Sequence, residues 1–170
     1  VASRFVDEGG AFIDQLTVDT VGQGAWIRVA PPVATRAVEA PGDPVALTAT
    51  GTLYGPFEEQ PTESETPPED APIVGTESVV LDRGPGEYES AGTLTATGAG
   101  FYTWVWEIEK DAQGENARYI RDSFRDWFGR VAETHVGPFQ PTAVSRSDAR
   151  LAVPGDEVAD TVTVSSVNGP

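Results

Sequence analysis

The sequence predicts an all-β protein, an Ig-like antiparallel β-sandwich. Its longest strand pattern, residues 100–110 (GFYTWVWEIEK), consists mainly of aromatic and β-branched residues that alternate with a period of two. Apolar residues occupy both faces of this pattern, so it should be a central strand that other parts of the chain cover on each side. With 18 glycines and 14 prolines among 170 residues, turns are frequent, which favours many short strands over helices.

Shorter patterns predict the strands around this central one. Residues 45–53 alternate most clearly, with apolar side chains on one face and mainly threonines on the other. The other expected strands are residues 12–18, 26–30, 76–81, 93–97, 131–136 and 140–145.

Two segments do not follow a strand pattern. Residues 58–72 are acidic, rich in proline and almost free of apolar side chains, which predicts a solvated loop outside the core. Residues 117–128 place aromatic and apolar side chains at roughly helical spacing before Gly129, which predicts either a short amphipathic helix or a loop anchored by aromatic residues.

Residues 4–18 resemble residues 150–164 at a constant offset of 146 positions. Arginine, glycine, aspartate, threonine and valine coincide in the two segments, as do several apolar positions. We interpret this as a tandem array in which residues 1–146 form one complete repeat and residues 147–170 the first strands of the next.

The composition limits the possible partners and chemistry. A formal charge of −16 argues against nucleic acids and anionic membranes as partners, and no apolar run is long enough to span a bilayer. The absence of cysteine excludes disulfides and thiolate chemistry. No motif for a cofactor or a metal ion is present, and the carboxylates of residues 58–72 lack the spacing of a calcium loop, so we expect neither group.

The candidate chemical residues begin with His135, the single histidine. A lone histidine in a strand is most often a half-buried structural residue. The alternative pairs it with Glu107, the ionisable group inside the aromatic central strand, whose carboxylate would need a partner if it lay among tryptophans.

These features resemble a family of extracellular domains. The strand order, Glu107 after Val105 and Trp106, and His135 shortly before Gln140 are similar to Ig-like stalk repeats of Gram-positive surface adhesins. Within that group they resemble the domains with a self-formed Thr–Gln ester cross-link, which include the VaFE-type repeats.

The resemblance implies a role for six residues. Glu107, His135 and Asp14 would be the acid and base groups that move protons, and Gln140 would be the acyl donor. The family's threonine nucleophile precedes the early aspartate, but no threonine precedes Asp14, so Thr17 is the nearest substitute and Thr142 could serve the next copy. Gln140 also lies closer to His135 than in the family, with two prolines nearby.

Three functions can be weighed. The resemblance and the repeat predict a stalk or spacer domain at the cell surface, anchored to the wall through other regions, with neighbouring repeats and an unknown host or surface ligand as partners. The alternative is a carbohydrate- or protein-binding adhesion module that uses exposed aromatics, for which Trp26 is the best candidate. We do not expect a turnover enzyme, because no nucleophile motif or metal-ligand cluster is present; at most the domain would form its own cross-link once.

Overall fold

The computed structural model describes residues 1–22, 24–30, 42–148 and 151–166, and its fold is an all-β, sandwich-like one. The main sheet contains β5 (Ile73–Leu81), β4 (Leu47–Phe57), β7 (Gly100–Ile108) and β8 (Phe124–Arg125) in that order, and β9 (Thr134–Gly137) also pairs with β7. All of these pairs are antiparallel. The predicted all-β class and the central position of residues 100–110 are therefore confirmed.

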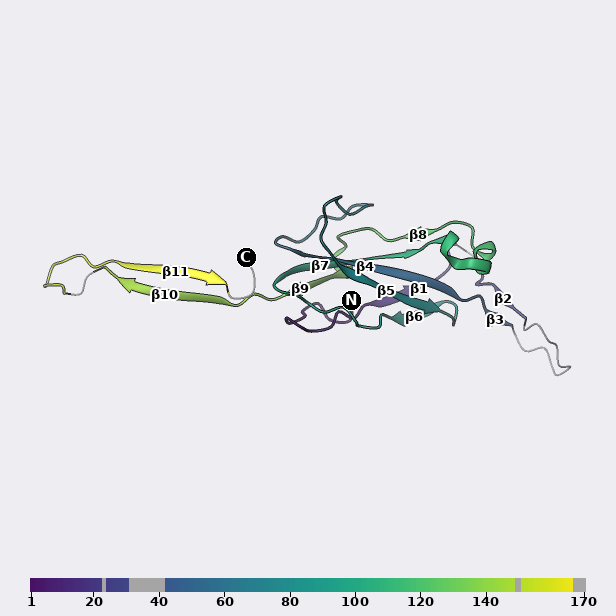
Figure 1. Ribbon diagram of the computed structural model, residues 1–170, viewed down its shortest axis with the longest axis horizontal. Coiled ribbons are helices and arrows are strands. Elements are labelled where there is room, and N and C mark those ends of the chain that lie inside the picture. The colour runs from purple at the N-terminus through teal and green to yellow at the C-terminus, as the bar shows by residue number, and fades with distance from the viewer. Residues whose placement is uncertain (23, 31–41, 149–150, 167–170) are drawn as a thin grey trace.

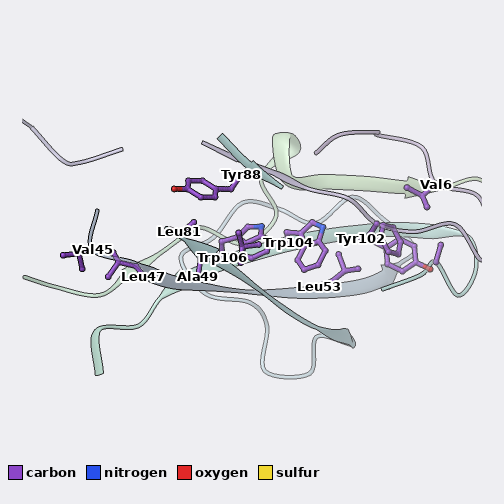
Figure 2. Packing of buried hydrophobic residues seen from close by; sticks show 13 residues of the cluster. Val6, Val45, Leu47, Ala49, Leu53, Leu81, Tyr88, Tyr102, Trp104 and Trp106 are labelled. Carbon is purple, nitrogen blue, oxygen red and sulfur yellow. The ribbon is translucent and has the colours of Figure 1, made fainter. Parts of the chain in front are cut away.

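A smaller layer covers one face of the main sheet. It consists of β1 (Gln15–Val18), β6 (Gly86–Glu89) and the chain segments beside them (Figure 1). Figure 2 shows the aromatic core that lies between the layers, in which Trp104 and Trp106 stack at a centroid distance of 5.2 Å. Gly51 of β4 lies under Trp106, and a Cβ atom there would come within 2.7 Å of the indole ring. Alternation along β7 thus sends its largest side chains into one core.

The opposite face of β7 has a cover of its own. Val105 packs there with Tyr54 and Phe128, and Ala71 contacts this group. The backbone of Ser64 exchanges two hydrogen bonds with Phe128, of 3.0 and 2.8 Å. No residue of 58–72 is buried, as predicted for a loop outside the core, but Ser64 and Ala71 contact the second face of the sheet.

The helical segments differ from the prediction. A 3₁₀ segment, η1, runs over Lys110–Tyr119, and a single turn, η2, over Val131–Glu133. Residues 117–128 form no continuous helix, since they contain β8 and belong to the aromatic-anchored alternative. Residues 93–97 form no named strand, but Thr95 bridges to Ala11, and the backbone of Leu94 and Ala96 bonds to residues 9–12.

Two hairpins lie at the periphery. The first joins β2 (Arg28–Val29) and β3 (Asp43–Pro44). The second joins β10 (Pro141–Ser147) and β11 (Asp160–Ser166) and extends away from the sandwich (Figure 1). Every residue of β10 is exposed, and Val162 and Val164 of β11 are more than half exposed. Among the described residues, this second hairpin forms no core with the sandwich. The prediction of residues 140–145 as a strand of the sandwich is therefore wrong, because that strand pairs with β11 instead.

The hairpin repeats two backbone hydrogen bonds of the N-terminal segment. Ala2 N donates to Ile13 O at 3.0 Å, and 146 positions later Asp148 N donates to Ala159 O at 3.1 Å. Likewise, Gly10 N donates to Asp7 O at 2.7 Å, and Asp156 N donates to Val153 O at 3.0 Å. The offset that relates the two sequences therefore also relates their backbone geometry. Residues 149, 150 and 167–170 of the expected second repeat lie outside the described residues.

Candidate functional site

Asp14 is the centre of a buried polar cluster. It directly precedes β1 and is fully buried in the core. Its Oδ2 accepts a hydrogen bond of 2.7 Å from Trp106 Nε1, and its Oδ1 lies 2.9 Å from the ammonium group of Val1. Its backbone bonds to Ser90, with Ser90 N donating to Asp14 O and Asp14 N donating to Ser90 Oγ, each at 2.9 Å. Asp14 therefore ties the small layer to the central strand.

Glu133 brings a second carboxyl group to the same place. Its pKa is raised from an ordinary value of 4.5 to about 8, first by burial and then by repulsion from the nearby Asp14 carboxylate. The Val1 ammonium opposes this effect. A second negative charge beside Asp14 in a buried site is unfavourable, so Glu133 is protonated at neutral pH.

His135 lies on β9 beside this pair and is fully buried. Its Nδ1 is 2.6 Å from the carbonyl oxygen of Ser3, which can only accept, so Nδ1 carries the proton. Its ring packs edge-on against Phe12 at a centroid distance of 5.0 Å. Burial lowers the pKa of His135, while the Ser3 hydrogen bond and the Asp14 charge act in the other direction. His135 is therefore a neutral core histidine whose Nε2 has no hydrogen-bond partner among the described residues.

Glu107 does not belong to this cluster. Its side chain faces away from Trp106, is about one third exposed and forms an ion pair of 3.0 Å with Arg125 Nε. His135 lies opposite Tyr102 in the β7–β9 register, on the face that β7 turns toward Phe12. The predicted His135–Glu107 pair is wrong, because alternation along β7 puts Glu107 on the other side of the sheet.

The three cross-link residues of the sequence analysis also lie outside this cluster. Gln140 is exposed just before β10, and its Nε2 donates to Pro141 O at 3.0 Å. Thr142 is exposed on β10, where its Oγ1 is 2.9 Å from Ser165 Oγ. Thr17 is exposed on β1, between Leu16 and Val18, which turn toward the core. The structure thus places Asp14 near Glu133 and His135. Thr17 lines a groove together with Asp14 and Glu133 from an exposed position, whereas Gln140 and Thr142 lie elsewhere.

A groove runs along the open side of the sandwich next to this cluster. Its first part, of about 110 Å³, is lined by Asp14, Glu133, Trp106 and the whole of β1. Its second part, of about 530 Å³, continues past Trp26 and Tyr119. The two parts share Val18, Ile108 and Phe124 and are therefore continuous.

Sequence reasoning missed two acidic residues. Glu133 is two positions from His135, and this spacing could have suggested that the two side chains share a direction. Glu77 is buried on β5 and accepts hydrogen bonds from the backbone of residues 92–94 and, at 2.6 Å, from Thr93 Oγ1. Burial alone would raise its pKa, but these hydrogen bonds outweigh burial and lower it. No sequence signal marks Glu77, because its donors lie in an irregular segment.

The cluster is suited to holding strands together. Its polar groups bond to one another and to backbone across long sequence distances, and His135 lines neither part of the groove along β1. Within the same residues, no group of three or more histidine, aspartate or glutamate side chains could hold a metal ion. No helix in the described parts of the chain has the length and apolar character needed to cross a membrane.

Comparisons with family models, with curated proteins and with solved structures find no match to this chain. The functional argument therefore depends on the fold and on the buried cluster.

Proposed function

We propose that this chain is a structural stalk or spacer repeat of a tandem-repeat, cell-surface protein. The observation that carries the proposal is the recurrence of the Ala2–Ile13 backbone hydrogen bond at Asp148–Ala159, 146 positions later. One sandwich is then followed by the first two strands of a second, and the described residues of these strands have no core of their own. Repeats joined in this way form a linear array.

The buried cluster supports a mechanical role. Asp14 bonds to Trp106 of the central strand, and His135 bonds to Ser3 near the N-terminus. Buried polar contacts of this kind join distant parts of the chain in a protein that lacks cysteine. They would hold the small layer against the main sheet when the two ends of a repeat are pulled apart.

The end of the sandwich from which the hairpin leaves also fits an array. An apolar groove of about 450 Å³ lies there, lined by Phe5, Phe101, Val136 and Phe139. Phe5 and Phe139 are 66% and 64% exposed, which is unusual for phenylalanine. Because the chain leaves the body beside this groove, the adjoining repeat is the occupant that it fits best.

The adhesion-module alternative has less support. Trp104 and Trp106 are buried and cannot stack on a sugar. Trp26 is half-buried, and its Nε1 is already bonded to Val45 O at 2.9 Å.

The Thr–Gln ester remains a prediction, and the proposal does not require it. Thr17 lines the groove beside Asp14 but is exposed, and Thr142 is exposed on β10, so neither hydroxyl has the buried base that a threonine nucleophile needs. The intact mass of the chain tests this point: we expect the full sequence mass, and a mass lower by one ammonia would show that the cross-link forms.

The stalk proposal is tested by building arrays of one, two and three copies of the 146-residue unit. In small-angle X-ray scattering, the maximum dimension should increase by the same increment with each copy. Under force, each copy should unfold separately and release up to about 500 Å of chain, at about 3.5 Å per residue. Arrays that stay compact, or that unfold in one event, would contradict the proposal.

A further inference from the structure

The outer edge of β1 offers unused backbone groups. Among the described residues, β6 is the one strand that pairs with β1. Ser90 N donates to Asp14 O, so the backbone of Asp14 points toward β6. The backbone N–H and C=O groups of successive residues alternate between the two edges of an antiparallel strand. Those of Leu16 and Val18 therefore also face β6, whereas those of Gln15 and Thr17 face the outer edge.

The distal hairpin shows which strand fits this edge. At an offset of 146 positions, β11 corresponds to residues 14–20, which contain β1, and β11 is paired with β10. In that register Arg146 faces Thr161 and Val144 faces Thr163, which correspond to Gln15 and Thr17. These are the two residues whose backbone points outward in the sandwich. Ile13 O and Ala159 O accept equivalent hydrogen bonds, from Ala2 N and Asp148 N. The backbone groups of the residues that follow therefore alternate between the two strand edges in the same order in both copies.

The groove follows the whole length of such a strand. Its two parts follow the chain from Asp14 to Val21, which covers the positions that correspond to β11. The side chains of a β10-type strand that would face the groove are those opposite Leu16 and Val18. These are Ser145 and Ala143, which are small enough for the 110 Å³ part beside Trp106.

We propose that the outer edge of β1 receives a β10-type strand, Pro141–Ser147, from another copy of this repeat. The strand adds antiparallel to β1, bonds to the backbone of Gln15 and Thr17, and closes the groove over Trp106 and Glu133. By the same 146-position offset, β11 of this chain corresponds to β1 of the next sandwich, and β10 is the strand added to its outer edge. Each junction in an array is then a continuous strand that leaves one core and enters the next.

The test uses the full chain with the sequence PTAVSR placed directly before Val1. In the repeat register Val1 stands where Ser147 stands, so these six residues would follow the groove. Hydrogen exchange of individual backbone amides is the readout. We expect exchange at Gln15 and Thr17 to slow by about tenfold or more, as for amides that join a sheet. Exchange at Leu16 and Val18, which already face β6, should change much less.

A matched control carries proline in place of the valine in the extension. Proline removes the N–H that would pair with Thr17 and should abolish the protection. Unchanged exchange at Gln15 and Thr17, or equal slowing with the proline extension, would overturn the proposal. The proposal rests on the repeat relation of the proposed function, but the two can fail separately. Scattering can show an extended array even if the outer edge of β1 is empty. Conversely, the edge can bind its strand even if the array is compact.

Discussion

Glu133 should make the stability of the protein depend on pH in an unusual direction. Its pKa is about 8 in the folded protein against an ordinary value of 4.5, because it is buried beside Asp14. A folded-state pKa above the unfolded value stabilises the fold at pH below 4.5, and this contribution is lost as pH rises through 8. We therefore expect the Glu133 contribution to fall between pH 5 and pH 9, and the change Glu133→Gln to remove this fall.

The size of the effect follows from the shift of about 3.5 units between 4.5 and about 8. At about 1.4 kcal/mol per unit, the full shift corresponds to about 5 kcal/mol, of which about 4 kcal/mol falls between pH 5 and pH 9. Glu133 keeps some contact with solvent, so about half of this, about 2 kcal/mol, is the expected value.

The assay is equilibrium unfolding in urea at pH 5 and pH 9 for the wild type and for Glu133→Gln. The control is Glu59→Gln, which removes the same charge at an exposed position. His135 acts in the opposite direction: burial lowers its pKa, so its contribution is present above its ordinary value of 6.5 and is lost as pH falls. That effect is common to all three proteins and cancels in their differences.

The expected result is a wild-type free energy of unfolding that loses about 2 kcal/mol more than that of Glu133→Gln between the two pH values. The Glu59→Gln protein should follow the wild type. Equal pH dependence of the wild type and Glu133→Gln would refute the protonated carboxyl pair, and with it the description of the buried cluster.

Four further results are expected. Trp106→Phe should cost about 2–3 kcal/mol in urea unfolding, because it removes the indole donor from the buried Asp14 carboxylate; a cost below about 1 kcal/mol would contradict this bond. Glu77→Gln should destabilise the fold at pH 7 but much less at pH 3, since the lowered pKa of Glu77 makes its contribution present above 4.5 and lost as pH falls; an equal cost at both pH values would argue against it. Removal of residues 141–170 should change the melting temperature by no more than about 2 °C, because the hairpin has no core contact with the sandwich; a large decrease would show that the hairpin belongs to this fold. Gly51→Ala should lower the melting temperature by several degrees, because its Cβ would collide with the Trp106 ring, and an unchanged value would show that the ring can move.

Local sequence patterns were sufficient for the strands with long, regular alternation. β7 was predicted within two residues at its C-terminal end, and β4 and β5 were found with shifted boundaries. Alternation is a local property of a strand, so it is visible without knowledge of the partner strand. Residues 93–97 do pair with residues 9–12, but over too short a stretch to form a named strand, and a local pattern does not show how far a pairing extends.

The buried cluster shows where such patterns stop. Asp14 and His135 were named as candidates, but Glu107 was assigned to them in place of Glu133. The sequence shows that Glu107 lies within a strand of tryptophans, and alternation separates it from Trp104 and Trp106. It does not show which face of that strand meets Asp14 and His135, because that depends on how the two layers pack.

The sequence by itself determined the all-β class, the central strand and the 146-position offset of the two end segments. Tertiary structure decided that Asp14 meets Trp106, 92 positions away, and that Glu133 holds a proton beside Asp14. The reason is physical: strand formation depends on neighbours along the chain, whereas a pKa and a buried hydrogen bond depend on neighbours in space. Those neighbours are fixed only when the two layers close over the core.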